Sequence, residues 1–248
     1  MIPGFVELVV PVYNEQAVLR ASIDRLADAM SRADFAWRIL IANNGSTDAT
    51  LDVARRAAAA LPAVRVLHVE AKGRGGALRR AWAETDAEFS IYMDVDLSTD
   101  LEAVGRTVAL LREGSDIVVG SRLDARSTIT RSWKREILSR VYNRLIRLAL
   151  RTRSFDDAQC GFKGVRVESV RPLLPRVVNN EWFFDTELLV LAEYAGLKIR
   201  TLPIRWVEDP DSRVNIPRTI LEDLQGLWRL RRTARQSADP SRAPKRIR

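Results

Sequence analysis

Strand-like and helix-like segments alternate through the first 120 residues, and this alternation constrains the fold more than any other feature of the sequence. Short apolar runs predict strands, and apolar residues that recur every three or four positions predict helices. The predicted strands are 6–12, 38–42, 64–69, 89–93 and 116–120, and the predicted helices are 16–30, a segment ending at 60, 77–85 and 101–112. This order is typical of an α/β protein with a doubly wound, mostly parallel sheet, helices on both faces and ligands at the carboxyl ends of its strands. Ser46 or Thr47 is predicted to cap the second helix.

The composition limits the metals and compartments that suit the chain. Its 248 residues are 46% apolar, enough for a sizeable core. The single Cys160 excludes an internal disulfide, and the single His68 excludes a site built from several histidines. Carboxylates would therefore hold any metal, which favours Mg²⁺ or Mn²⁺. The sequence begins without a secretory signal and contains no long uncharged apolar run, so we expect a cytoplasmic protein, soluble or peripheral.

Basic charge is concentrated in two segments. Residues 122–153 carry ten Lys and Arg against Asp124 and Glu136, a balance of +8, and residues 229–248 carry eight against Asp239, a balance of +7. The whole chain has a net charge of +8, so the remainder sums to −7. Such concentration indicates an anionic partner, which phosphates, anionic lipid and nucleic acid would all provide.

Two carboxylates directly follow the fourth predicted strand. In an extended segment Asp94 and Asp96 would project to the same side, and a divalent cation that also binds a diphosphate would relieve their repulsion. The alternative is a pair of solvated acids, with Asp96 or Ser98 capping the next helix. Their place at the ligand-binding edge of the sheet favours the cation.

Five motifs occur in the order and spacing that resemble family 2 glycosyltransferases. They are 10–15 (VPVYNE), 43–48 (NNGSTD), 72–77 (KGRGGA), 94–96 (DVD) and 120–122 (GSR). Two later motifs, 157–163 (DAQCGFK) and 182–188 (WFFDTEL), are similar to those of polyprenyl-phosphate sugar transferases, and to the dolichyl-phosphate β-glucosyltransferases more than to the mannose enzymes. The resemblance covers residues 5–230. It implies a GT-A fold in a single domain, 1–235, followed by a basic tail, 236–248, that we expect to be disordered.

The resemblance also implies a nucleotide-sugar site, with Pro11, Tyr13 and Glu15 as its wall and Ala42 and Asn44 at the base and ribose. Asp96 would ligate the metal, with Ser98 as a weaker ligand. The expected nucleotide-sugar residues are Pro11, Tyr13, Glu15, Ala42, Asn44, Lys72, Asp94, Val95, Asp96, Arg122 and Arg213. The family usually has aspartates where this chain has Asn43 and Asn44, and the mannose enzymes often have Gln where it has Ser98.

Several charged residues are candidates for contact with phosphates or for catalysis. The Lys72 loop offers backbone N–H groups and cations to phosphate oxygens, and the first βα turn lacks the glycine pattern of a dinucleotide site. We expect Arg122, Arg135 and Arg213 to bind phosphates. The candidate catalytic residues are Asp96, Asp157, Asp185 and Arg135. For Asp157 and Asp185 a turn aspartate and a helix N-terminal acid are the structural alternatives. Cys160 is disfavoured as a nucleophile because no histidine partners it.

A helix is predicted over 133–151, with a stripe formed by Arg140, Arg144, Arg147 and Arg151. The apolar residues predicted to cover its opposite side are Ile137, Leu138, Val141, Tyr142, Leu145, Ile146 and Ala149. Such a helix either lies in the headgroup plane of an anionic membrane or packs on the core with a solvated basic face. The implied lipid acceptor favours the membrane, at its cytosolic face. This helix is also compatible with an integral-membrane partner or with an oligomer. Nucleic acid is a disfavoured partner because no aromatic platform accompanies the arginines.

These features predict a metal-dependent, inverting transfer of a hexose from a nucleotide diphosphate sugar, UDP-glucose above others, to a polyprenyl phosphate. A GDP-mannose donor, or a glycan or small-metabolite acceptor, is the first alternative. A non-catalytic nucleotide-binding or scaffold protein is the second, and the Asn43–Asn44 departure is its main support.

Overall fold

A computed structural model describes residues 1–130, 133–207, 223 and 225–231. The strands are β1 (Ile2–Val12), β2 (Trp37–Asn44), β3 (Val64–Val69), β4 (Ala87–Met93), β5 (Ile117–Ser121), β6 (Thr128–Thr130), β7 (Phe162–Arg166), β8 (Ile199–Pro203) and β9 (Arg205–Val207). The helices are α1 (Leu19–Met30), α2 (Thr50–Ala60), α3 (Arg74–Glu84), α4 (Glu102–Arg112), α5 (Trp133–Leu150), α6 (Val167–Val170) and α7 (Phe184–Tyr194), with a 3₁₀ helix, η1, at Arg171–Arg176. None of the helices in this part of the chain combines the length and apolarity needed to cross a bilayer.

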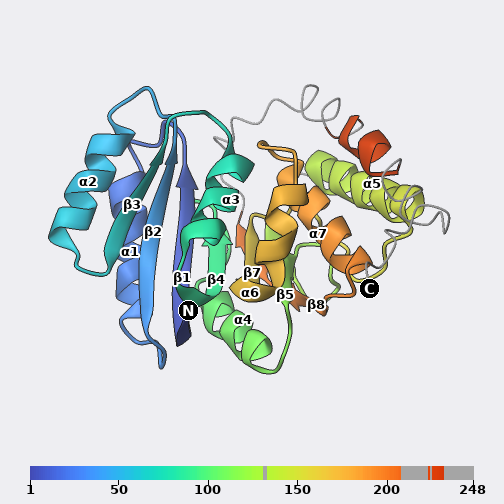
Figure 1. Ribbon diagram of the computed structural model, residues 1–248, viewed down its shortest axis with the longest axis horizontal. Helices are drawn as coiled ribbons and strands as arrows, with labels where there is room; N and C mark the ends of the chain where they lie inside the picture. Colours follow the sequence, from blue (N-terminus) through green and yellow to red (C-terminus); the bar gives the residue numbers. More distant parts are fainter. Residues whose placement is uncertain (131–132, 208–222, 224, 232–248) are drawn as a thin grey trace, which may run out of the picture.

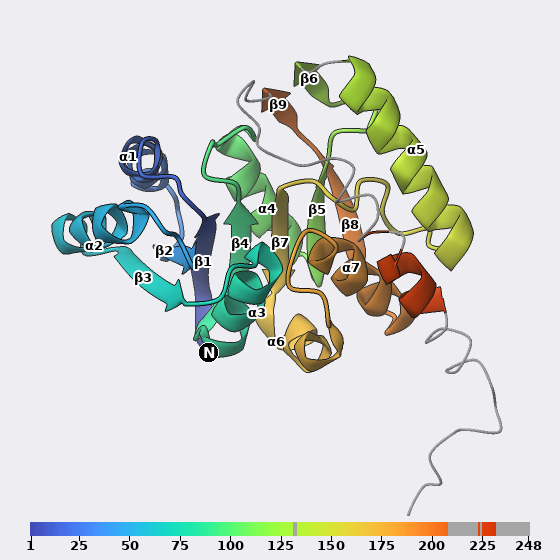
Figure 2. The same cartoon turned by 90° about the horizontal axis from the view of Figure 1, so that it is seen from above.

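The main sheet has seven strands in the order β3-β2-β1-β4-β7-β5-β8. All pairs are parallel except those that β7 makes with β4 and β5. The mostly parallel sheet predicted from the sequence is therefore confirmed. Figure 2 shows α1, α2 and α4 on one face of the sheet and α3, α6 and α7 on the other. Strands β6 and β9 form a separate parallel pair.

Each face of the sheet buries its own apolar cluster because successive side chains of a strand point to opposite sides. In β1, Leu8 and Val10 pack with α1, α2 and α4, whereas Val9 packs with the cluster that contains residues of α3 and α7. Both faces are covered, so the strands are apolar on both sides, as their continuous apolar runs predict.

The reversed strand β7 brings the second half of the chain to the ligand-binding edge. Phe162 at its start pairs with Met93 at the end of β4. Because the two strands are antiparallel, the segment that precedes β7 lies where β4 ends. The amide N–H of Asp94 donates a 3.2 Å hydrogen bond to the carbonyl oxygen of Gly161. Figure 1 shows β7 between β4 and β5.

The start of α2 corrects one prediction from the sequence. Neither Ser46 nor Thr47 caps this helix, which begins at Thr50. Ser46 Oγ instead accepts a hydrogen bond from the backbone N–H of Asn14, and Thr47 Oγ1 accepts one from its amide. These hydroxyl groups therefore join the loops after β1 and β2, and α1 begins only at Leu19.

Helix α3 begins three residues earlier than predicted, at Arg74, so Gly75 and Gly76 lie in its first turn. Gly75 packs directly on α7, where an added Cβ would overlap the side chain of Phe184. The glycines look unfavourable for a helix in isolation. Here one of them allows two helices to approach closely.

Helix α5 has the predicted position, and only some of its apolar residues contact the core. Ile146 and Leu150 are buried, and Tyr142 packs against the same cluster. Four other apolar residues of the helix are exposed: Ile137, Leu138, Val141 and Leu145. These four residues are therefore not part of the core, because α5 contacts the core through a narrow face.

We expect Gly75→Ala to lower the free energy of unfolding by about 1–3 kcal/mol, since the new methyl group would force α3 away from Phe184. The matched control is Gly76→Ala, whose Cβ would lie an ordinary 3.5 Å from Asn180 Oδ1. That change should be neutral or stabilising by about 1 kcal/mol at most. Urea unfolding of both variants measures the difference, and equal stability would contradict the close α3–α7 contact.

Candidate active site

The loops after β1, β2 and β3 meet at the carboxyl edge of the sheet. Lys72 places its ammonium group 4.1 Å from the centre of the Tyr13 ring. The backbone N–H of Glu15 donates to Thr50 Oγ1 at 2.8 Å. Gly45 has a φ of +71°, and an added Cβ would collide with the backbone at Glu70. These contacts join the three loops to one another.

The two asparagines that depart from the family pattern have different partners. The Asn44 amide donates to the Val12 carbonyl oxygen at 2.8 Å and accepts from the Gly73 N–H at 3.3 Å. An aspartate could not make the first contact, because a carboxylate would face a carbonyl oxygen. Asn43 is fully buried, with Nδ2 2.8 Å from His68 Nδ1. Within the described chain Asn43 Oδ1 has no hydrogen-bond partner.

The Asp94-Val95-Asp96 segment is a turn, which corrects the extended geometry assumed from the sequence. Strand β4 ends at Met93, and the N–H of Leu97, which has a φ of +51°, donates to the Asp94 carbonyl oxygen. The Asp94 side chain is 30% exposed, and Asp96 is exposed. Asp96 Oδ1 accepts a 3.0 Å hydrogen bond from the N–H of Ser98. The two carboxylates still lie at the same strand end.

A buried ion-pair cluster lies beside Asp94 and centres on Asp185, the second residue of α7. Its two carboxylate oxygens accept from Arg74 Nη1 at 2.8 Å and from the Tyr92 hydroxyl at 2.7 Å, and Lys163 Nζ lies 3.2 Å away. Burial alone would raise the pKa of Asp185, but Lys163 and Arg74 lower it below its usual value. Asp185 is therefore ionised and fully engaged with its cationic neighbours.

Arg74 connects this cluster to Asp94. Its Nε lies 3.6 Å from Asp94 Oδ1, and its guanidinium lies 4.7 Å from the centre of the Trp182 ring. Gly161 packs on the other side of Asp94, where any Cβ would overlap the carboxylate. Asp94 is thus held between α3 and the segment that precedes β7.

Asp157 forms a second buried pair, with Arg122. The Nε and Nη2 atoms of Arg122 donate to the two carboxylate oxygens at 2.8 and 2.9 Å, and the backbone N–H of Arg122 donates as well. Burial would raise the pKa of Asp157, but Arg122 lowers it overall. The guanidinium also lies 5.0 Å from the centre of the Trp206 ring. A bidentate pair of this kind fixes the orientation of the arginine.

The carboxylates at the end of β4 fit a hard divalent cation. Burial raises the pKa of Asp94 to about 6, Arg74 lowers it, and Asp96 and Asp185 raise it. A cation next to Asp94 and Asp96 would stabilise both in their ionised form. The described residues contain no group of three or more His, Cys, Asp or Glu side chains that could hold a metal. Hard divalent cations commonly keep water ligands and also bind ligand oxygens.

The structure thus brings most of the predicted site residues to one edge of the sheet. They are Pro11, Tyr13, Glu15, Ala42, Asn44, Lys72, Asp94, Val95, Asp96, Ser98, Arg122, Asp157 and Asp185. The Arg135 side chain and the whole of Arg213 lie outside the described residues. Their roles stay predictions, as do those of the other residues.

Arg74, Tyr92 and Lys163 are site residues that the sequence analysis did not single out. Lys163 is completely buried, and its Nζ also donates to the carbonyl oxygen of Cys160 at 2.6 Å. A lone lysine beside Phe162 and Val165 in an apolar strand was the available signal, since buried lysines are rare without partners. Its partner Asp185 is 22 positions away in the sequence, so the sequence does not indicate which acid pairs with Lys163.

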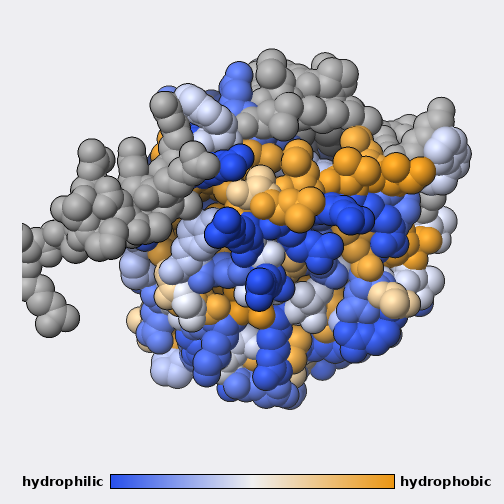
Figure 3. Space-filling view, turned by 90° about the vertical axis from the view of Figure 1, so that its right-hand side faces the viewer, coloured by the Kyte–Doolittle hydropathy of each residue, from blue (hydrophilic) through white to orange (hydrophobic). Residues whose placement is uncertain are grey.

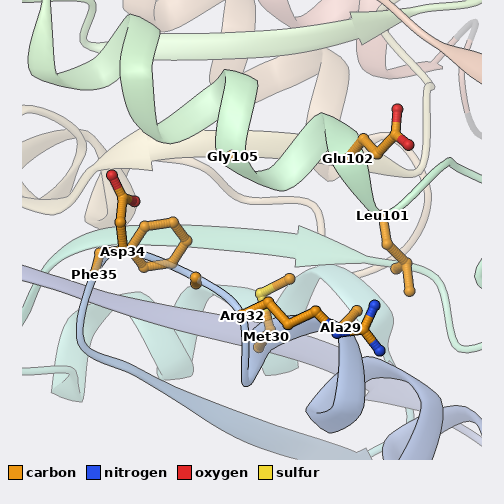
Figure 4. Close-up of a pocket in the computed structure, with 9 residues that line it drawn as sticks. Ala29, Met30, Arg32, Asp34, Phe35, Leu101, Glu102 and Gly105 are labelled. Carbon is orange, nitrogen blue, oxygen red and sulfur yellow. The ribbon is translucent and has the colours of Figure 1, made fainter.

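A hollow of about 280 Å³ lies away from these residues, between the end of α1 and the start of α4. Figure 4 shows Met30 and Phe35 on one side of it and Leu101 and Glu102 on the other. None of the predicted site residues lines it. We therefore place the site at the strand ends.

Comparison with known proteins identifies similar sequences and folds. Residues 7–174 match the model of glycosyl transferase family 2. The chain is 36% identical over 235 residues to glycosyltransferase AglD of Haloferax volcanii, which covers 91% of this chain and 37% of that protein. It is 29% identical over 226 residues to dolichyl-phosphate β-glucosyltransferase ALG5C of Trichomonas vaginalis, covering 86% and 66%. The chain thus spans little more than a third of the first relative and about two thirds of the second.

The fold is similar to that of glucosyl-3-phosphoglycerate synthase from Mycobacterium tuberculosis. A crystal structure of that protein with Mn²⁺, UDP-glucose and phosphoglyceric acid has a TM-score of 0.67 and 17% identity, covering 91% of this chain and 80% of that one. The predicted GT-A fold is confirmed by this likeness.

We expect Cys160 to be unreactive in the folded protein. Burial raises the pKa of its thiol to about 12, so very little thiolate exists at neutral pH. Ellman's reagent should leave the native chain unmodified and react fully after denaturation in urea. The positive control is Ser31→Cys, at an exposed position after α1. Rapid modification of native Cys160 would contradict its burial.

Breaking the Asp157–Arg122 pair should destabilise the fold strongly. Asp157→Ala leaves the charge of Arg122, which is only 15% exposed, without its partner, a change that costs about 3–5 kcal/mol. The control is Asp124→Ala, which removes the partner of the exposed Arg126 and should change stability little. Urea unfolding measures both, and a similar small loss in each would show that the buried pair is not structurally important.

Proposed function

The chain belongs to glycosyl transferase family 2, and from this membership we propose that it transfers a hexose from a nucleotide diphosphate sugar to a polyprenyl phosphate. The observation that carries the proposal is the pair of accessible carboxylates, Asp94 and Asp96, where β4 ends. The GT-A fold and the buried ion-pair cluster around Asp185 also support the proposal.

The donor that we propose is UDP-glucose. Its support is the glucosyl transfer named in the dolichyl-phosphate relatives and the UDP-glucose bound by the structural neighbour. We assign Tyr13, Ala42 and Asn44 to the nucleoside, with Pro11 and Glu15 as the neighbouring wall. Lys72, which contacts Tyr13, is assigned to the diphosphate as a point charge.

The metal that we propose is Mg²⁺ or Mn²⁺, held by Asp96, with Ser98 or water beside it. Asp94 and Val95 are assigned to the nucleotide sugar. When bound, the metal supplies positive charge to the leaving diphosphate.

The chain's own residues bind and orient the reactants. The acceptor phosphate is already anionic at neutral pH, so its oxygen can attack the anomeric carbon without a strong base. The bond to the diphosphate then breaks with inversion. Arg122, held rigidly by Asp157, and Arg74, held by Asp185, provide cations that need no rearrangement.

Asp157 and Asp185 therefore act in this proposal by positioning these cations and not by accepting protons. The lowered pKa of each carboxylate supports that role. Arg135 and Arg213 are assigned to phosphates of the acceptor or donor, as the resemblance implies.

We also propose that the protein works peripherally at the cytosolic face of an anionic membrane. The support is the dolichyl phosphate in the relatives' names and the local charge of +8 over residues 122–153. Phosphate headgroups attract clustered Lys and Arg residues.

Asp96→Asn should reduce transfer by roughly a hundredfold or more, because the developing charge on the diphosphate loses its metal. The assay is run in detergent with Mn²⁺. It measures the UDP that is released and the radiolabelled glucose that is transferred to polyprenyl phosphate. Asp34→Asn, an exposed acid elsewhere on the surface, is the matched control and should leave the rate unchanged. Circular dichroism checks that both variants fold.

Full activity of the wild-type protein in EDTA would contradict the metal-dependent mechanism. The first alternative is tested with GDP-mannose as the donor and with soluble glycans or metabolites as acceptors. Transfer with these substrates in place of UDP-glucose and polyprenyl phosphate would favour it. A scaffold would bind the nucleotide without releasing any nucleoside diphosphate.

A further inference from the structure

The outward face of α5 carries a row of large apolar side chains that the core does not cover. Trp133, Val141 and Leu148 are 68%, 60% and 72% exposed, and Ile137 and Leu145 are also exposed. Their spacing of four, four, four and three residues places them on one side of the helix. Figure 3, which views the molecule from the side of α5 in Figure 1, shows apolar side chains gathered there beside hydrophilic ones. A continuous exposed patch of this kind marks an interaction surface.

Arginines accompany the apolar row. Arg140, Arg144, Arg147 and Arg151 are all exposed. Only one acidic residue, Glu136, lies on the helix, and it pairs with Arg140. A surface that combines apolar side chains with cations is complementary to an anionic lipid bilayer, where acyl chains lie below phosphate headgroups.

The opposite side of α5 is bonded to the candidate active site. Asn143 Oδ1 accepts a 2.8 Å hydrogen bond from the N–H of Ala158, next to Asp157. The Tyr142 hydroxyl lies 3.1 Å from Thr186 Oγ1 and accepts from Gln159 at 3.2 Å. Contact at the outer face of α5 would therefore hold the segment that positions Arg122 and Asp94 close to the lipid surface.

We propose that α5 lies in the headgroup plane of an anionic bilayer, with the row Trp133, Ile137, Val141, Leu145 and Leu148 inserted among the acyl chains. The inference rests on the proposed function in taking a lipid phosphate as the acceptor. It adds hydrophobic insertion, through named residues, to a contact that charge alone would make weak and salt-sensitive.

Other occupants fit this surface less well. A symmetric second copy would bring the same positive faces together. Residues 232–248 contain six Lys and Arg and one acid, so this segment repeats the charge of α5 instead of complementing it. Nucleic acid would leave the apolar row without a partner.

The test is flotation of the full chain with phosphatidylcholine vesicles, with and without phosphatidylglycerol. We expect the wild type to bind only the vesicles that contain phosphatidylglycerol. The double variant Val141→Ser, Leu148→Ser should bind these vesicles at least roughly tenfold more weakly. The matched control is Val178→Ser, an exposed apolar residue outside α5. Arg144→Gln with Arg147→Gln should also weaken binding, whereas Arg25→Gln on α1 should not.

Fluorescence quenching by lipids brominated on their acyl chains tests insertion directly. Quenching should be strong for the wild type and reduced in Trp133→Phe. Vesicle binding that the serine variants do not change, or the absence of quenching, would overturn the inference. So would a soluble dimer that the serine variants dissociate, because the row would then be a contact between copies.

A transfer assay with a short, water-soluble polyprenyl phosphate separates this inference from the proposed function. The serine variants should retain wild-type rates there, since no lipid surface is involved. Normal transfer without vesicle binding would overturn the membrane contact alone, and vesicle binding without any transfer would overturn the proposed function alone. Thermal melting confirms that each variant is folded.

Discussion

One buried carboxylate joins parts of the chain that are far apart in sequence. Asp185 of α7 binds Arg74 of α3, Tyr92 of β4 and Lys163 of β7. Without it, two cations would stay in the interior without their anion, which is among the costliest changes a core can undergo. Arg74 also approaches Asp94, so the position of the candidate metal-binding turn depends on this contact.

The reversal of β7 makes that contact possible. A parallel strand in the same place would start at the opposite edge of the sheet, and Gly161 and Asp157 would lie far from the end of β4. The antiparallel strand instead delivers them beside Asp94 and Arg122. The first half of the chain thus supplies Arg74, Arg122 and the turn at Asp94. The second half supplies the carboxylates that bind these arginines, Asp185 and Asp157, and the helix α5 that faces outward.

The sequence predicted the first five strands, the four helices between them and the edge where the polar motifs meet. It did so because apolar periodicity and turn residues are local signals. Its errors lie where distant residues intervene. Ser46 and Thr47 suit a helix cap, yet Asn14 from another loop takes their hydroxyl groups. Glycine is typical of a loop, yet Gly75 lies in α3. A larger residue there would overlap the side chain of Phe184. For α5 the sequence left core packing and membrane contact open, and the structure shows that the neighbouring elements cover only one narrow face.

By itself, the sequence determined the α/β class, the order of the motifs and the acidic pair after the fourth strand, since each depends on residues near one another in the chain. Only the tertiary structure decided which charges are free and which are paired. In the sequence, Asp157 and Asp185 are candidates for catalytic acids. In the structure each of them is paired with a cation, Arg122 and Arg74 respectively. Asp94 and Asp96, in contrast, retain access to solvent. The physical reason is that ionisation, burial and hydrogen bonding depend on neighbours in space, and those neighbours come together only when the strands pair.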